Sequence, residues 1–333
     1  MFDKSEQEIM KNWNKDDEVL VSILCMVYNH ERYLPKALDS FLMQETNFPF
    51  LIVAGEDCSL DNSMKILKEY KQKYPNLIKI VSSENNVGQL ENFIRTMNAC
   101  ESEYVAMCDG DDYWTDKHKL QIQIDEMKKH PQCALSFHPA QELYGDRFDK
   151  LLAKHHDGNK IFTTAEIIEG DGSFCPTASL VLKKRTFANF PEQFYKEAPF
   201  GDHFLQISAS LEGGALYIDK VMCIYRKEHE GSWSTETYSN IEKRKTAFEK
   251  HMKSMDELNI LLDNKYKKEI NKIKSKYHYL MAVFFLSKNH LKEFREYIKK
   301  ANDIYPLELP KPKILYLFRK ITPVIKLIKI LKT

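Results

Sequence analysis

The chain has 333 residues, with 49 lysines and arginines against 48 aspartates and glutamates, and 43% of its residues are hydrophobic. This ordinary globular composition excludes collagen, low-complexity disorder and coiled-coil rods. The polar N-terminus is unlike a signal peptide, and no run of ~18 apolar residues offers a membrane span, so we expect a cytoplasmic protein. The seven cysteines are scattered singly, which favours reduced thiols over a disulfide framework or a zinc ribbon.

From Val19 onward, short apolar runs alternate with amphipathic segments, a pattern typical of βα units around a mostly parallel sheet. The predicted strands are residues 21–27, 51–54, 77–81, 104–108 and 134–137. Between the first two, apolar residues recur at i, i+3, i+4, i+7 and i+8, as on one face of a helix: Leu34, Ala37, Leu38, Phe41 and Leu42. We therefore predict an α/β fold with helices flanking the sheet, preceded by a separate N-terminal segment, residues 1–18.

After about residue 140 the alternation loosens, with turn signals before a strand-like run at residues 178–182. Residues 236–308 are then rich in lysine and glutamate and poor in glycine and proline. This composition predicts a helical appendage that packs on the core.

Residues 309–333 form a basic tail without a single acidic residue, whereas the rest of the chain is net acidic. An acidic body argues against nucleic-acid binding. In a helix from Val324, apolar residues and lysines would gather on opposite sides. Residues 313–333 could then contact an anionic membrane, or the apolar side could dock on the protein's own helices. The lack of acidic residues favours the membrane, and hence a peripheral location on its inner face.

Polar residues follow three of the predicted strands, where an open parallel sheet binds its ligands. The densest group, Asp109, Asp111 and Asp112, places three carboxylates within four residues. Such carboxylates repel one another unless a cation lies among them, and Mg²⁺ or Mn²⁺ holding a nucleotide diphosphate is the natural occupant. The alternative is that one aspartate caps the next helix and the others are solvated.

Glu56 and Asp57 follow the second strand in the same way. Their carboxylates could accept hydrogen bonds from a base N–H or a ribose hydroxyl. They could equally belong to a capping segment, since Ser59, Asp61 and Asn62 come just before the next predicted helix.

Four segments, in order within residues 19–137, resemble the family 2 glycosyltransferases, which have the GT-A fold: VSILCMVYNHERYLPKALDSFLMQ, GEDCSLDNS, NNVGQLENF and CDGDDYWTDKHKL. A weaker resemblance continues through Gly201-Asp202-His203 to about Ser234. The resemblance implies a Rossmann-like GT-A domain over residues 19–235. Residues 19–137 would form its nucleotide-sugar half and residues 138–235 its acceptor half.

The resemblance also implies roles for individual residues. The nucleotide would be held by Met26, Val27, Tyr28, Glu56, Asp57, Asn86 and Asp109. Asp111 resembles the metal ligand of the family's Asp-x-Asp motif, and His229 is a second candidate ligand. The sugar and acceptor pocket would include Asp112, Trp114, Gly201 and Trp233.

Asp202 matches the family's catalytic base at the start of an acceptor-side helix, and its alternative is an ordinary N-cap. The chain departs from the family at position 58, where Cys58 replaces the glycine of the common Asp-Asp-Gly-Ser motif. The turn must therefore avoid positive φ there or strain the cysteine.

Together these features indicate an inverting, metal-dependent glycosyltransferase. By resemblance, it would move a sugar from a nucleotide-diphosphate donor, such as a UDP-sugar, to a hydroxyl of a glycan or lipid-linked glycan, as in bacterial surface polysaccharide assembly. One alternative is an inactive nucleotide-sugar-binding or scaffolding subunit, which would have no need of Asp202. Another is a sugar nucleotidyltransferase, whose glycine-rich phosphate loop is missing after the first strand.

Overall fold

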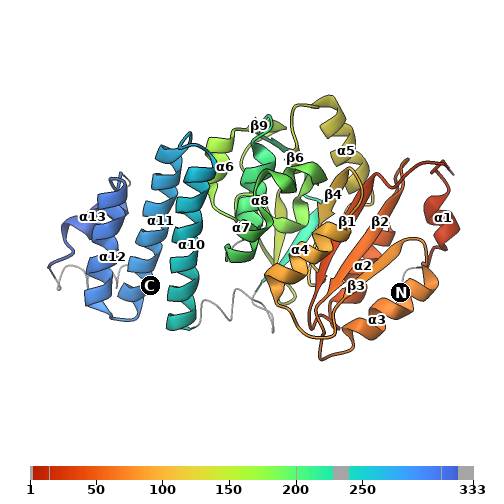
Figure 1. Ribbon diagram of the computed structural model, residues 1–333, viewed down its shortest axis with the longest axis horizontal. Coiled ribbons are helices and arrows are strands. Elements are labelled where there is room, and N and C mark those ends of the chain that lie inside the picture. The colour runs from red at the N-terminus through yellow and green to blue at the C-terminus, as the bar shows by residue number, and fades with distance from the viewer. Residues whose placement is uncertain (1–2, 15, 200, 228–239, 309, 322–333) are drawn as a thin grey trace. The chain divides into compact units, whose positions relative to one another are not determined.

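The computed structural model describes residues 3–14, 16–199, 201–227, 240–308 and 310–321. Two compact units make up the chain: Met1–Ile167 with Gly172–Ala247, and Ile168–Asp171 with Phe248–Thr333. The boundary falls inside two helices, α6 (Thr164–Gly170) and α10 (Ile241–Leu261), which are labelled in Figure 1.

An eight-stranded sheet organises the first unit, in the order β3-β2-β1-β4-β10-β6-β11-β9. Its strands are β1 (Val21–Val27), β2 (Phe50–Glu56), β3 (Ile78–Ser82), β4 (Tyr104–Met107), β6 (Leu135–Phe137), β9 (Lys160–Phe162), β10 (Val181–Lys183) and β11 (Ala215–Tyr217). Only β9 and β10 run against the other strands of this sheet. The predicted mostly parallel sheet is therefore confirmed, and the run at residues 178–182 becomes a short 3₁₀ turn followed by the antiparallel β10.

The order of the strands determines where the large sheet can bind a ligand. Successive strands β1, β2 and β3 step in one direction, and the chain then returns to place β4 on the other side of β1. Such a reversal leaves a crevice at the carboxyl ends of the two strands beside it. The segments after β1 and β4 both open onto this edge.

Helices cover the sheet, most of them through one apolar face, whereas α8 is buried on all sides from His203 to Ser210. Those of the first unit are α1 (Glu6–Met10), α2 (Leu34–Leu42), α3 (Ser63–Lys73), α4 (Gln89–Ala99), α5 (Lys119–Lys129), α7 (Glu192–Glu197) and α8 (Gly201–Ser210). In α2 the five predicted apolar residues are all buried. Helix α4 packs on β1 and β2, and a side chain at Gly55 would collide with Thr96, so a glycine is needed for this close approach.

A second sheet, which the sequence pattern did not predict, has the order β5-β12-β7-β8. Its strands are β5 (Tyr113–Trp114), β7 (Ala140–Tyr144), β8 (Arg147–Leu152) and β12 (Cys223–Lys227). Strand β5 comes directly after Asp112 and pairs with β12. The second sheet thus connects the end of β4 to elements of the acceptor half.

The second unit is helical, with α10, α11 (Lys267–Ser287), α12 (Leu291–Ile304) and α13 (Pro310–Leu317). The Phe285 ring stacks on Tyr297 with a centroid separation of 5.3 Å, and the Ser275 hydroxyl donates to the Ala301 carbonyl at 2.8 Å. These contacts join α11 to α12, and the predicted C-terminal helices are confirmed.

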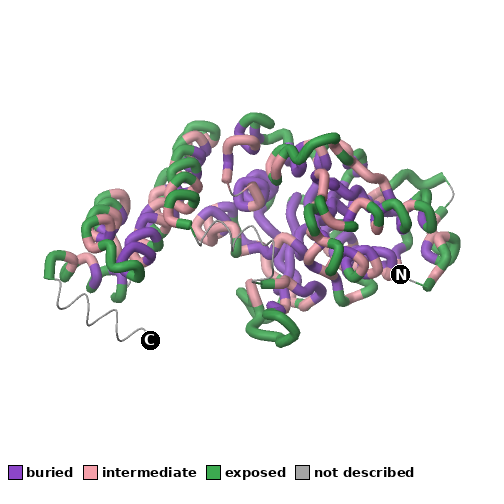
Figure 2. Tube along the Cα trace, turned by 90° about the horizontal axis from the view of Figure 1, so that it is seen from below, coloured by how far each residue is buried: buried purple, intermediate pink, exposed green. Residues whose placement is uncertain are grey.

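The tube in Figure 2 shows buried residues gathered inside the molecule, and β1, β2 and β4 are among the most buried segments. Exposed residues predominate on the outward sides of the helices and in the connecting loops. Among the described residues, no helix combines the length and apolar character that crossing a membrane requires.

Candidate functional site

The loop after β1 is tied to the loop after β2. The Asn29 backbone N–H donates to the Ser59 hydroxyl at 3.0 Å, and the Leu60 N–H donates back to Asn29 Oδ1 at 2.8 Å. A further bond joins the Glu31 N–H to Asp61 Oδ2 at 2.8 Å. Two strand ends that lie side by side in the sheet therefore present one organised rim.

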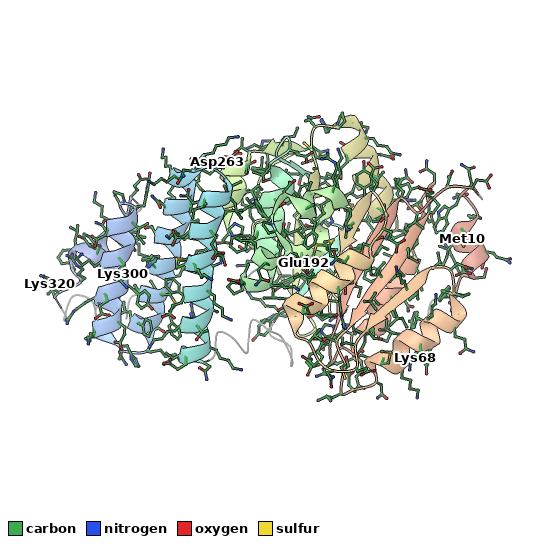
Figure 3. All side chains as sticks on the ribbon, in the orientation of Figure 1. Met10, Lys68, Glu192, Asp263, Lys300 and Lys320 are labelled. Atoms are coloured by element: carbon green, nitrogen blue, oxygen red, sulfur yellow. The ribbon has the colours of Figure 1, made fainter. Side chains whose placement is uncertain are left out.

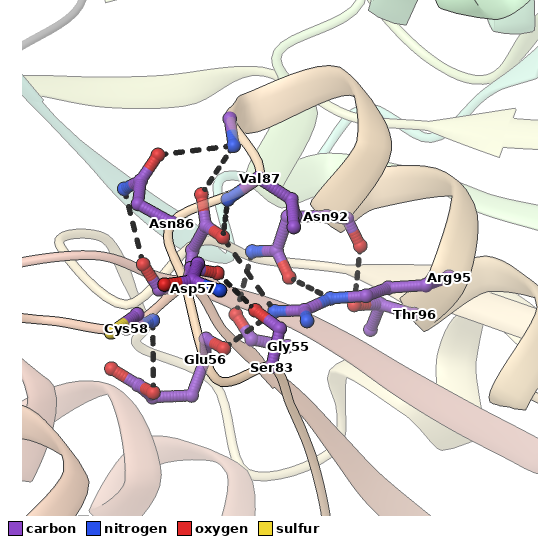
Figure 4. A network of polar contacts seen from close by, with 12 residues as sticks. Gly55, Glu56, Asp57, Cys58, Ser83, Asn86, Val87, Asn92, Arg95 and Thr96 are labelled. Carbon is purple, nitrogen blue, oxygen red and sulfur yellow. Dashed lines mark hydrogen bonds and ion pairs between the residues drawn. The ribbon is translucent and has the colours of Figure 1, made fainter.

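Glu56 closes the turn that follows β2 (Figure 4). Its buried carboxylate accepts the backbone N–H groups of Cys58 at 3.1 Å and Ser59 at 2.6 Å. Cys58 adopts φ = 56°, the left-handed conformation that disfavours residues with a Cβ. Of the two outcomes expected for this turn, the structure shows the strained cysteine.

Asp57 joins the same strand end to the loop that precedes α4 (Figure 4). Its Oδ1 accepts the Val87 N–H at 2.8 Å, and its Oδ2 accepts the Gly88 N–H at 2.9 Å. The Arg95 guanidinium lies 3.7 Å from Oδ1. Asp57 is thus fixed in position by two amides and one cation, and it is buried.

Asn86 and Arg95 complete this network. The Asn86 side chain donates to the Asp57 carbonyl at 3.1 Å and accepts the Gly88 N–H at 3.1 Å. Arg95 donates to Asn92 Oδ1 at 2.8 Å and to the Glu56 carbonyl at 2.5 Å. The nucleotide-site candidates Glu56, Asp57 and Asn86 are therefore linked by hydrogen bonds into one polar cluster.

The remaining nucleotide-site candidates lie at the end of β1, where two offer backbone carbonyls and one an exposed ring. The Val27 side chain is buried, and its carbonyl accepts the Asp57 N–H at 3.0 Å. Met26 is half-buried, and its carbonyl accepts the Gly110 N–H at 2.9 Å. Tyr28 is 41% exposed at the strand end, so its ring is accessible from outside.

The acidic segment after β4 lies against the loop after β1. A Cβ on Gly110 would lie 2.8 Å from His30 Nδ1, so only glycine permits this approach. His30 Nε2 lies 3.9 Å from Asp111 Oδ2. Desolvation, followed by the negative charges of Asp111 and Asp202, raises the pKa of Asp109 to about 8.

Asp202 reaches this acidic segment from the acceptor half of the chain. It is the second residue of α8, is half-buried, and accepts the His203 N–H at 2.9 Å. Its charge also contributes, after burial and the charges of Asp112 and Asp111, to raising the pKa of Tyr225. Asp202 is therefore close enough to Asp109 for its charge to act on that carboxyl group, as the charge of Asp111 does.

Asp112 has a different position from the other two aspartates of its segment. It is buried, and its Oδ1 accepts the Arg226 backbone N–H at 2.8 Å. Burial and the neighbouring Asp111 raise its pKa well above the usual value. The Arg226 guanidinium lies 4.9 Å from the Tyr33 ring centroid and 5.1 Å from that of Tyr113. Asp112 therefore anchors β12 beside the site rather than lining an open pocket.

Trp114 also differs from the expectation of a pocket residue. It is 1% exposed, and its indole N–H donates to the Ala178 carbonyl at 2.9 Å. Its ring packs edge-to-face on Phe41 at 4.8 Å, and the buried Lys119 ammonium lies 4.2 Å from its centroid. The indole is part of the core and offers no surface to a sugar.

Three further residues are predicted to belong to the sugar pocket or the metal site. Gly201 is half-buried and begins α8, so it is adjacent to Asp202. His229 and Trp233 lie outside the described residues.

Within the described part of the chain, no cluster of three or more histidine, cysteine or acidic side chains has the arrangement of a metal site. The carboxylates of Asp109 and Asp111 are nevertheless hard oxygen donors, and after desolvation the charge of Asp111 is the next cause that raises the pKa of Asp109. Mg²⁺ is commonly bound by one or two carboxylates together with substrate phosphates. The donor set fits a divalent cation of that kind.

Sequence reasoning missed four residues of this site: His30, Arg95, Tyr225 and Arg226. All except Arg95 lie within segments that carry the family resemblance. Their place in these segments is the signal that could have identified them as site residues. Arg95 lies on α4 one turn after Asn92, and its polar contacts are visible only once the helix is packed on the sheet.

Comparisons with known proteins agree with this architecture. The family model of Glycosyl transferase family 2 matches residues 22–190, about half of the chain. An uncharacterized protein of Mycobacterium tuberculosis is 29% identical over 217 residues, which cover 64% of this chain and 60% of that protein. The poly(ribitol-phosphate) beta-glucosyltransferase of Bacillus spizizenii is 33% identical over 94 residues, 28% of this chain and 15% of that enzyme.

Among solved structures, residues 1–349 of S. aureus TarS in complex with UDP-GlcNAc superpose with a TM-score of 0.65 at 18% sequence identity. The superposition covers 92% of this chain and 89% of that one. It confirms the GT-A fold predicted from the sequence.

Proposed function

The chain belongs to glycosyltransferase family 2, and we propose that it transfers a sugar from a nucleotide-diphosphate donor to an acceptor hydroxyl. The observation that carries this proposal is the meeting of Asp109 and Asp111, after β4, with Asp202, from α8. Asp109 and Asp111 would be needed to bind a donor. Asp202 would be needed only if a sugar is transferred, because only then must a proton be taken from an incoming hydroxyl.

The nucleotide would bind across the rim formed by the loops after β1, β2 and β3. Each Asp57 oxygen accepts one backbone N–H, and a carboxylate oxygen has a second lone pair with which to accept a base N–H or ribose hydroxyl. Tyr28 and Val87, each 41% exposed, provide apolar surface beside it. A UDP-sugar is the donor we favour, because the TarS structure that shares this fold contains UDP-GlcNAc.

We place a divalent cation, Mn²⁺ or Mg²⁺, at Asp111 with Asp109 beside it. When bound, such an ion neutralises charge that develops on the leaving diphosphate. His229 remains a proposed second ligand. Arg226, between the rings of Tyr33 and Tyr113, adds a fixed positive charge on the β12 side of the same site.

Asp202 would act as the general base that takes the proton from the attacking acceptor hydroxyl. Bases in this role typically accelerate reactions ~10²–10⁴-fold. Attack on the face opposite the leaving diphosphate inverts the configuration of the anomeric carbon. Gln206, one turn further along this buried helix, donates to the Gly172 and Cys175 carbonyls at 3.1 and 3.0 Å. These bonds tie α8 to the segment that lies against the Asp202 carboxylate.

For the acceptor, we propose a glycan or lipid-linked glycan of the cell envelope, reached from the inner face of the membrane. The similarity of part of the chain to a poly(ribitol-phosphate) beta-glucosyltransferase supports a cell-envelope acceptor. The basic residues 313–333 support peripheral contact with an anionic membrane surface.

Thermal unfolding in the presence of UDP, GDP, CDP or dTDP, with and without Mn²⁺, tests the donor site. A ligand that binds only the folded state at 100 times its Kd stabilises it by about 2.7 kcal/mol. We expect UDP with Mn²⁺ to raise the unfolding temperature, and Asp111→Ala to abolish the metal-dependent part. If no nucleotide shifts the wild-type transition, the donor site is contradicted and the scaffolding alternative gains support.

A further inference from the structure

We propose that His155 and Phe174 form a stacking platform for a sugar ring of the acceptor, beside the segment that lies against Asp202. This inference rests on the proposed function and adds a carbohydrate subsite to it. The two rings come from separate loops, one after β8 and the other before β10. Neither His155 nor Phe174 belongs to a segment that resembles the family's motifs.

The platform lies at the edge of the sheet that carries the donor site. Strand β10 is antiparallel to both β4 and β6, so the carboxyl ends of β4 and β6 point the same way, and β11 is parallel to β6. The Phe174 ring lies 5.8 Å from Phe137 at the end of β6, and the His155 ring lies 6.1 Å from Tyr217 at the end of β11. At ~4.8 Å per strand, the end of β6 is roughly 10 Å from the end of β4, within the span of an oligosaccharide.

A short chain segment connects the platform to Asp202. A Cβ built on Gly172 would lie 3.4 Å from Asp202 Oδ1, which places this backbone against the carboxylate. Phe174 is only two residues further along, so the two Cα atoms are at most about 7.6 Å apart. Gln206 holds the carbonyls on both sides of Phe174, at Gly172 and Cys175.

The two rings form a parallel stack with one accessible member. Their centroids are 3.9 Å apart with an interplanar angle of 16°. His155 Nε2 lies 2.8 Å from the Phe174 carbonyl, which can only accept, so Nε2 carries the hydrogen. Phe174 is half-buried, but His155 is exposed although Phe174 covers one of its faces and the Phe137, Phe162 and Tyr217 rings lie 5.5–6.1 Å from it. The stack therefore presents imidazole surface to solvent.

The loop that carries His155 is exposed and yet firmly held. Asp219, just after β11, accepts the Lys154 ammonium at 2.6 Å and the Gly158 N–H at 2.7 Å, and its own N–H donates to Asn159 Oδ1 at 3.0 Å. A ring that is already ordered loses little conformational freedom when a ligand covers it. Flat aromatic surfaces with a few polar groups beside them are typical of small-molecule sites, and the C–H faces of a sugar ring are apolar.

The test uses three variants of the full chain. His155→Ala removes the exposed ring, and His155→Phe restores a ring without the Nε2 bond. His156→Ala is the matched control, because His156 is also exposed in the same loop and the one described contact of its side chain is with the Gly158 carbonyl, at 3.1 Å. The Lys154 ammonium donates to the backbone carbonyl of His156, which the substitution leaves in place. The probes are the methyl glycosides of glucose, galactose, mannose and N-acetylglucosamine, measured by saturation-transfer NMR in the presence of UDP.

We expect at least one glycoside to bind the wild type and His156→Ala equally. Its affinity should fall about threefold to tenfold in His155→Ala, the range of one aromatic contact, and recover in His155→Phe. Unchanged binding in His155→Ala, or no glycoside binding to a wild type that UDP stabilises, would contradict the platform. The UDP-induced shift in unfolding temperature should be the same in all variants, so its absence from the wild type would instead identify a failure of the proposed donor site.

Discussion

At the scale of single residues, neighbouring carboxylates have different tasks. Glu56 closes its own turn, Asp57 fixes a loop about 30 residues later in the chain, and Asp112 holds the backbone of β12. The sequence predicted that these acids lie at strand ends, because a strand end follows directly from a local pattern. It did not predict the partners of Asp57 and Asp112, because the amides that these two carboxylates accept come from segments far away in the sequence.

Cys58 offers a direct test of this local geometry. Because its φ is 56°, a residue with a Cβ is strained there and glycine is not. We expect Cys58→Gly to be more stable than Cys58→Ala by about 1 kcal/mol, measured by urea unfolding. Both variants lose the thiol, so the comparison isolates the backbone. Equal stability, or a more stable alanine variant, would mean that the turn relaxes out of the left-handed region.

At the scale of elements, the large sheet could be predicted and the small one could not. Strands β1, β2 and β4 are buried apolar runs, which stand out in any sequence. Strand β8 is largely exposed and β5 has only two residues, so neither has a recognisable apolar pattern. The family resemblance places Trp114 in the pocket, and no local pattern shows that β5 turns its indole into the core.

Helix α13 and the residues just after it carry an exposed apolar stripe. Ile314, Leu317, Phe318 and Ile321 follow the i, i+3, i+4, i+7 spacing and are 38–60% exposed. Lys311, Lys313 and Lys320 are exposed as well, and Figure 3 labels Lys320 beside α13. No acidic residue occurs from Pro310 to the end of the chain. This combination suits a membrane surface with negative charge.

Replacing two residues of this stripe tests the membrane contact. We expect the double variant Leu317→Glu, Ile321→Glu to sediment with phosphatidylglycerol vesicles at least several-fold less than the wild type, because it loses apolar area and gains repulsion. Ile260→Glu is the matched control, since Ile260 is 70% exposed on α10, away from the stripe. Equal sedimentation of the double variant and the control would exclude this face from membrane binding.

At the scale of the whole molecule, the site depends on a contact between its two halves. Asp109 and Asp202 are far apart in the sequence, and no periodicity or composition relates them. Only the family resemblance pairs them, and folding explains the pairing, because α8 lies between β10 and β11, two of the strands that extend the sheet beyond β4. The aromatic platform was missed because its rings lie in loops that match no motif and meet only where β6 and β11 end side by side.

Turnover of UDP-sugars by the wild type and Asp202→Asn is the most direct test of the central claim, that the two halves together catalyse sugar transfer. UDP release would be measured over a panel of UDP-sugars with Mn²⁺, beside UDP binding by thermal unfolding. We predict that the wild type releases UDP from at least one donor. Asp202→Asn should bind UDP equally well but release it ~10²–10⁴-fold more slowly. A variant that keeps the wild-type rate, or a wild type that binds UDP and turns over no donor, would contradict the account.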